Sequence, residues 1–153
     1  MDKVFEKLIN NCIENDYKYY VTSLENDNQI VVVFRKEFGT LFAYQIEDGE
    51  LTEIGEGRFR FYCNKKFLNL DLIRVRQDLR RHGIGKKIIC CLLKFAKTVG
   101  CKKVSLISAL SSVGFYQKLG FDLVSPPDDF RTIVFEKQLN LKELDLNDDQ
   151  LGL

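Results

Sequence analysis

One stretch limits the possible folds more than any other. An apolar strand runs through a basic turn that contains glycine and into a long helix. The pattern over Phe67–Val75 is typical of a β-strand, and Arg80–Lys86 form the turn. From Ile84 to Val99 the apolar residues recur on one helical face, and a glycine then predicts the helix end. A strand, turn and helix in this order indicate a domain that combines a sheet with helices.

The residues before this unit predict a helix followed by several antiparallel strands. Apolar residues recur at helical spacing over 4–13, and Asp2 is a suitable N-cap. Ile30–Phe34 is apolar throughout, which indicates a strand covered on both faces. Asp48 and the glycine after it predict a tight hairpin turn. The range 50–57 is ambiguous and predicts a short edge strand with a bulge at Gly55 or Gly57. Further strands are expected over 17–24, 41–46, 58–63, 104–107, 121–124 and 132–135, and a short helix over 111–119.

Together these elements predict a mixed α/β or α+β fold with one mostly antiparallel sheet. A chain of 153 residues is the size of a single domain. We expect that domain to span residues 1–138. Residues 139–153 carry mainly acidic charge and are expected to form a loose or weakly helical tail.

The composition argues against several classes of protein. The 23 Lys and Arg residues nearly cancel the 22 Asp and Glu residues, which disfavours a dedicated nucleic-acid binder. The N-terminus is charged, and no apolar run is long enough for a signal peptide or a membrane span, so we expect a cytoplasmic protein without a membrane partner. With five cysteines, no C-x-x-C pair and His82 as the single histidine, we expect reduced thiols and no metal site.

The basic turn has the features of a phosphate site. The first N–H groups of a helix lack internal partners, and the helix dipole adds positive charge there. Glycine lets a ligand approach the backbone closely, and Arg80, Arg81, Lys86 and Lys87 add charge. Neither the P-loop pattern nor the dinucleotide-binding fingerprint is present. The alternative is a simple strand-to-helix turn whose basic residues face solvent.

Two motifs resemble those of the GNAT acetyltransferase superfamily. Arg80, Gly83 and Gly85 match its R/Q-x-x-G-x-G/A pattern, and Phe115–Phe121 resembles its F-Y-x-K-x-G-F block. The resemblance covers roughly residues 68–121. It implies a GNAT-like single domain whose sheet contains a splayed strand pair and is flanked by helices. It also implies acetyl-CoA as co-substrate and direct transfer of its acetyl group to a primary amine of an unidentified acceptor.

The resemblance also implies positions for the co-substrate. The backbone of Ile73, Arg74 and Val75 would pair with the pantetheine arm, and N–H groups of the turn would hold the pyrophosphate. Lys118 or Lys87 would contact the adenine end. The implied binding residues are Ile73, Arg74, Val75, Arg80, Arg81, His82, Gly83, Ile84, Gly85, Lys86, Ala109, Phe115 and Lys118.

Two side chains are implied to take part in catalysis. Tyr116 would protonate the leaving thiolate as general acid, and a backbone N–H, that of Ile73, would hold the oxyanion. The alternative for Tyr116 is a core aromatic residue. Asp71 is the first candidate for the base that deprotonates the amine, and its alternative is a surface aspartate paired with a basic residue. Glu53 and Glu56 are second candidates, and some family members use ordered water instead.

Two departures from the family leave other functions open. Many members carry Asn where this chain has Ala109, so Ser108 or Ser111 would have to substitute. The short region after the first helix implies a more open acceptor site, or one completed by a second subunit in a homodimer. A non-catalytic acyl-CoA-binding module is the main alternative function. A third is an RNA-directed protein that uses a basic stripe of Arg74, Arg76, Arg80, Arg81, Lys86 and Lys87.

Overall fold

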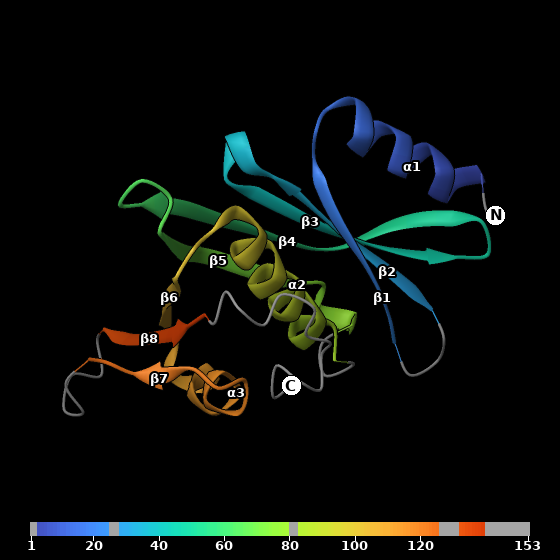
Figure 1. Ribbon diagram of the computed structural model, residues 1–153. Helices are drawn as coiled ribbons and strands as arrows, with labels where there is room; N and C mark the ends of the chain where they lie inside the picture. The colour runs from blue at the N-terminus through green and yellow to red at the C-terminus, as the bar shows by residue number, and fades with distance from the viewer. Residues whose placement is uncertain (1–2, 25–27, 80–82, 126–131, 140–153) are drawn as a thin grey trace. The chain divides into compact units, whose positions relative to one another are not determined.

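The computed structural model describes residues 3–24, 28–79, 83–125 and 132–139 (Figure 1). The predicted N-cap Asp2, the turn residues Arg80, Arg81 and His82, and the predicted tail from residue 140 onwards lie outside the described residues. The chain divides into two compact units. The first contains Met1–Arg58 and Leu72–Cys91, and the second contains Phe59–Asp71 and Leu92–Leu153.

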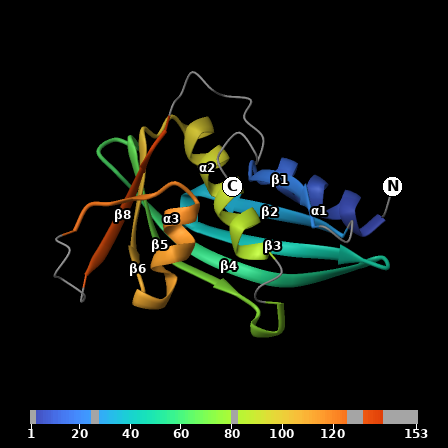
Figure 2. The same cartoon turned by 90° about the horizontal axis from the view of Figure 1, so that it is seen from below.

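The described residues form one sheet and three α-helices, in agreement with the predicted fold class. The strand order is β1-β2-β3-β4-β5-β6-β8-β7 (Figures 1 and 2). The recorded pairs are antiparallel except that of β5 with β6. The α-helices are α1 (Lys3–Glu14), α2 (Ile84–Val99) and α3 (Val113–Lys118), with short 3-10 turns η1 (Lys36–Phe38), η2 (Gln77–Leu79) and η3 (Leu110–Ser112). The strands are β1 (Lys18–Ser23), β2 (Gln29–Arg35), β3 (Thr40–Glu47), β4 (Glu50–Tyr62), β5 (Phe67–Val75), β6 (Lys103–Ser108), β7 (Asp122–Leu123) and β8 (Ile133–Gln138).

Strand β2 forms the centre of the first unit. All five residues of Ile30–Phe34 are buried, so the prediction of a strand covered on both faces is confirmed. Val31 and Val33 face α1, where they pack against Cys12. The expected hairpin turn between β3 and β4 is also confirmed, because Asp48 has a φ of 51° and the glycine after it one of 75°.

Strand β4 differs from the prediction, because the two segments expected at 50–57 and 58–63 form one continuous strand of 13 residues. The pairing of β3 with β4 shifts register between Ala43 and Tyr44, which pair with Gly55 and Glu53. Ile54 is therefore the extra residue of a β-bulge. A bulge was expected nearby, but at one of the two glycines.

The two glycines of β4 serve close packing instead. A Cβ on Gly55 would lie 2.9 Å from Cδ1 of Ile88 in α2 and 3.0 Å from the carbonyl oxygen of Arg74. A Cβ on Gly57 would lie 2.9 Å from the carbonyl oxygen of Leu72 and 3.0 Å from Cγ of Leu41. Only a residue without a side chain fits at these positions, since real Cβ atoms do not approach other atoms so closely.

Helix α2 is buried on more than the one face that its spacing predicted. Ile88–Leu93 are six consecutive buried residues, and they include both Cys90 and Cys91. The helix ends as expected at Gly100, whose φ is 99°. Within the described residues, no helix is both long enough and apolar enough to cross a bilayer.

The second unit has an aromatic core. The rings of Phe59 and Phe95 meet edge to face at 5.5 Å between centroids, a favourable arrangement for aromatic pairs. Strands β5 and β6 pair in parallel from Phe67 to Leu70. Among the described residues this pairing goes no further, although β5 continues to Val75.

We predict that Gly57→Val lowers the free energy of unfolding by about 1–3 kcal/mol, because the new side chain meets a backbone oxygen and a buried leucine. Gly114→Ala is the matched control. An added Cβ there meets nothing within 4 Å, and alanine favours the helix by about 0.5–1 kcal/mol over glycine. Urea unfolding of both variants tests the prediction, and equal stability would contradict it.

Candidate functional site

The start of α2 is an open helix N-terminus. Gly83 precedes the helix with a φ of 79°, a left-handed conformation that side-chain-bearing residues rarely adopt. Its carbonyl oxygen accepts the backbone N–H of Lys87 at 3.2 Å, which is the first helical bond among the described residues. The amides of the first turn therefore have no partner within the helix. A Cβ on Gly83 would meet no atom of the described residues within 4 Å, and the first turn contains no acidic residue.

This arrangement fits a diphosphate group. Unpaired amides and the positive end of a 16-residue helix both attract an anion, and the open space at Gly83 leaves room for its oxygens. Lys86 adds a partly exposed positive charge within the same turn. The described part of the predicted turn, Gly83–Lys86, is therefore suited to the role that the sequence suggested.

Strand β5 leads toward this turn. Arg74 within the strand and Arg76 just beyond it are each paired with an acid. Nη1 of Arg74 lies 3.8 Å from Oε1 of Glu56, and Nε of Arg76 donates to Oδ1 of Asp78 at 3.0 Å. Such exposed pairs contribute little stability. They do neutralise two members of the basic stripe that the RNA hypothesis required. The first pair also places Glu56, a second candidate for the base, next to the cation of Arg74.

Asp71 lies in a polar network of the second unit. Arg60 donates to its carboxylate through Nε at 2.7 Å and Nη2 at 2.9 Å, and Nδ2 of Asn69 donates at 2.6 Å. Oγ of Ser105 in turn donates to Oδ1 of Asn69 at 2.9 Å. The hydrogen bond from Arg60 is the main cause that lowers the pKa of Asp71, and partial burial opposes it. A lowered pKa makes a weaker base, so these contacts favour the alternative of a paired surface aspartate.

Tyr116 of α3 is buried, with 7% of its surface exposed. Its ring contacts those of Phe115, Phe121 and Phe135 at centroid distances of 5.1, 5.7 and 6.1 Å. Among the described residues its hydroxyl has no hydrogen-bond partner. Burial raises the pKa of Tyr116, so the phenol keeps its proton at neutral pH. The ring of Tyr116 therefore packs against its aromatic neighbours, and its hydroxyl keeps a proton that it can donate.

The other predicted binding residues of the second unit, Ala109, Phe115 and Lys118, are exposed. Ala109 lies between β6 and η3 in an extended conformation, and its carbonyl oxygen accepts the hydroxyl of the buried Ser108 at 2.7 Å. Ser108 therefore uses its proton locally, which weakens it as a substitute for the missing Asn. Phe115 and Lys118 of α3 are exposed. Within the described residues, no three His, Cys, Asp or Glu side chains group as metal ligands.

The predicted site residues fall into two groups. Ile73–Val75 and Gly83–Lys86 lie in the first unit, whereas Asp71, Ala109 and Phe115–Lys118 lie in the second. The sequence did not reveal Arg60 as the partner of Asp71, because Arg60 lies on another strand. It also did not reveal a cavity beneath α1, which is lined by an arginine and aromatic residues.

Comparison with known proteins places this geometry in context. Residues 2–121 match the Acetyltransferase (GNAT) family. A protein of Schizosaccharomyces pombe named glucosamine 6-phosphate N-acetyltransferase is 31% identical over 94 residues, which cover 56% of this chain and 84% of that protein.

Solved structures of acetyltransferases are similar in fold. Nourseothricin acetyltransferase superposes with a TM-score of 0.54 at 17% identity, over 85% of this chain and 94% of that chain. Tetrahymena GCN5 gives a TM-score of 0.54 at 13% identity, over 67% of this chain and 70% of that chain. N-acetylglutamate synthase from Neisseria gonorrhoeae, complexed with coenzyme A and N-acetyl-glutamate, gives 0.53 at 14% identity, over 65% of this chain and 26% of that chain. At these identities the likeness concerns the fold alone.

We predict that the contacts of Asp71 stabilise the fold only while its carboxyl group is ionised. Because the folded pKa lies below the ordinary value of 3.8, this stability is present above pH 3.8 and is lost as the pH falls through the folded pKa. Asp71→Asn should therefore be less stable than the wild type at pH 7, and the difference should shrink in acid. Arg60→Gln should show the same pH dependence and add little to Asp71→Asn. Thermal unfolding between pH 7 and pH 2 measures this, and a constant difference would contradict it.

Proposed function

Because the chain belongs to the acetyltransferase (GNAT) family, we propose that it transfers an acetyl group from acetyl-CoA to a primary amine. Membership makes the protein an acyltransferase, and the family uses acetyl-CoA as co-substrate. The observation that carries the proposal is the N-terminus of α2. Gly83 there has a left-handed conformation, an added Cβ would meet none of the described atoms within 4 Å, and the first helical turn contains no acidic residue.

Holding the co-substrate is the task of the first unit. The amides of Ile84, Gly85 and Lys86 bind the pyrophosphate, and the side chain of Lys86 adds charge. The backbone of Ile73–Val75 pairs with the pantetheine arm, as the resemblance implies. The remaining proposed contacts come from Arg80, Arg81 and His82, which lie outside the described residues, and from Ala109, Phe115 and Lys118.

Acetyl-CoA supplies an activated thioester when it is bound. Tyr116 donates its hydroxyl proton to the departing thiolate, as general acid. Its burial supports this role, because a raised pKa keeps the proton in place until negative charge develops on the sulfur. The amide of Ile73 stabilises the oxyanion that forms at the carbonyl.

The amine must lose a proton before it attacks. Asp71 stays the first proposed base, but its pairing with Arg60 lowers its basicity. Glu56 is similarly close to Arg74, whereas Glu53 is exposed on β4. These contacts favour ordered water as the immediate proton acceptor, with a carboxylate such as Glu53 acting through it.

The amines to be tested as acceptors are chosen partly from the names of the relatives. The S. pombe relative is named for glucosamine 6-phosphate, so this amino sugar phosphate belongs in the panel. A lysine peptide, a polyamine and free amino acids complete it.

We further propose that a second subunit completes the acceptor site and that the protein works in the cytoplasm.

A non-catalytic acyl-CoA-binding module is the second candidate. The pairing of Asp71 and the lack of an Asn at Ala109 favour it. Release of free thiol from acetyl-CoA, measured with each amine of the panel, separates the two functions. Thiol release that requires an amine supports the enzyme, whereas coenzyme A binding without turnover on any amine supports the module.

We predict that Gly83→Glu weakens coenzyme A binding at least about tenfold, or ~1.4 kcal/mol, by placing bulk and negative charge at the pyrophosphate. Gly100→Glu is a matched control, because Gly100 also has a positive φ and open space around an added Cβ but lies at the other end of α2. Both variants place a glutamate at a positive φ, so a larger loss of affinity in Gly83→Glu reports the site. Calorimetry measures both affinities, and equal losses would count against the phosphate site.

We predict that Tyr116→Phe lowers kcat about 100-fold while leaving the affinity for coenzyme A essentially unchanged. The phenylalanine keeps the ring contacts with Phe121 and Phe135, so the fold should persist. Steady-state kinetics with calorimetry on the same preparation tests this. An unchanged kcat would remove the general-acid assignment but would leave the co-substrate site standing.

A further inference from the structure

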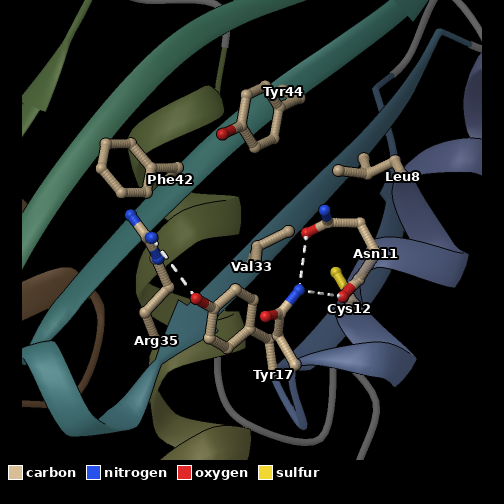
Figure 3. A pocket seen from close by; sticks show the side chains of 9 residues that line it. Leu8, Asn11, Cys12, Tyr17, Val33, Arg35, Phe42 and Tyr44 are labelled. Atoms are coloured by element: carbon tan, nitrogen blue, oxygen red, sulfur yellow. Dashed lines mark hydrogen bonds between the residues drawn. The ribbon is translucent and has the colours of Figure 1, made fainter.

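A cavity of about 410 Å³ lies in the first unit, between α1 with the residues that follow it and strands β2 and β3 (Figure 3). Its volume is within the range of about 300–1,000 Å³ that is usual for small-molecule sites. None of its residues belongs to the proposed acetyl-transfer site. The cavity is lined by Leu8, Asn11, Cys12, Asn15, Tyr17, Val33, Arg35, Phe42 and Tyr44.

The guanidinium group of Arg35 is held in place by aromatic rings. Its central carbon lies 5.2, 5.1 and 5.8 Å from the ring centroids of Tyr17, Phe38 and Phe42. Its Nη2 donates to the hydroxyl of Tyr17 at 3.3 Å, and Figure 3 shows the two groups pointing toward each other. The rings therefore fix the direction of a planar cation at the edge of the cavity.

The same guanidinium lacks an acidic partner. Among the described residues Arg35 forms no ion pair, and its Nε is buried without a hydrogen-bond acceptor. Oγ1 of Thr40, the residue that pairs with Arg35 across β2 and β3, is likewise buried and unpartnered among the described residues. Leaving such groups unsatisfied costs free energy, and aromatic faces supply no acceptor oxygen. The site thus has a charge that a bound anion would complement.

The rest of the lining suits a small molecule with an apolar body. Leu8, Cys12 and Val33 form an apolar wall, and Cys12 and Val33 are buried core residues. On the α1 side, Nδ2 of Asn15 donates to the carbonyl oxygen of Asn11 at 2.8 Å, so amide groups form a polar rim. Burial raises the pKa of the Tyr44 phenol and the nearby Glu53 adds to the shift, so this hydroxyl stays neutral.

We propose that this cavity binds a small organic oxyanion, a carboxylate or a phosphate monoester, carried on a planar apolar body. The Nη end of Arg35 binds the oxyanion, because Nε itself is excluded from solvent. The planar body packs between the ring of Phe42 and the wall of Leu8 and Val33. This site shares no lining residue with the proposed acetyl-transfer site.

The test is direct binding to the full chain, measured by calorimetry with benzoate, phenyl phosphate and benzamide. Benzoate and phenyl phosphate distinguish a carboxylate site from a phosphate site, and benzamide is the neutral mimic. At least one of the two anions should bind, and benzamide should bind about tenfold more weakly or worse. Arg35→Gln should lower the affinity for the preferred anion by a similar factor.

A second pair of variants does not touch the arginine. Asn11 and Asn10 are neighbouring exposed asparagines on α1, but only Asn11 lines the cavity. Asn11→Trp should block binding of the preferred anion, because the larger side chain fills part of the cavity. Asn10→Trp should leave the affinity for that anion unchanged. Thermal unfolding checks that each variant folds. The proposal is overturned if neither anion binds, if benzamide binds equally well, or if the two tryptophan variants behave alike.

Discussion

The close approach at Gly55 is the contact on which the first unit depends. A Cβ on Gly55 of β4 would lie 2.9 Å from Cδ1 of Ile88 and 3.0 Å from the carbonyl oxygen of Arg74. Glycine is therefore required for these three groups to approach so closely. The contact sets how closely α2 lies on the sheet. Since the open N-terminus at Gly83 is the first part of the same helix, the packing of a buried glycine also positions the proposed phosphate site.

Local patterns were sufficient to predict the elements with strong periodicity. The apolar run of β2, the Asp48 hairpin turn and the ends of α2 were all predicted correctly, because each depends on residues adjacent in sequence. Strand β4 was predicted as two pieces because glycines ordinarily interrupt strands. In the structure Gly55 and Gly57 lie within one strand, since they accommodate contacts from residues that are distant along the chain.

The candidate site divides in the same way. The start of α2 at Gly83 could be predicted because its glycines and charges are contiguous in the sequence, and its role in binding phosphate stays a prediction. The environment of Asp71 could not, since its partner Arg60 comes from another strand and depends on the pairing register. The cavity at Arg35 is a further case, because Tyr17, Phe38 and Phe42 surround the guanidinium only after the sheet has formed.

The bulge at Ile54 has a consequence for how this chain can vary in length. On either side of it, Gly55 pairs with Ala43 and Glu53 pairs with Tyr44, so the extra residue resets which side chains of β4 point to each face. Deleting Ile54 alone would remove the bulge and leave a regular ladder, in which Glu53 and Gly55 keep their partners and their faces. Deleting a single residue elsewhere in β4, with the bulge retained, would exchange the inner and outer faces of every residue on one side of the deletion. Position 54 is therefore the one place in this strand where the loss of a single residue preserves the pattern of buried and exposed side chains.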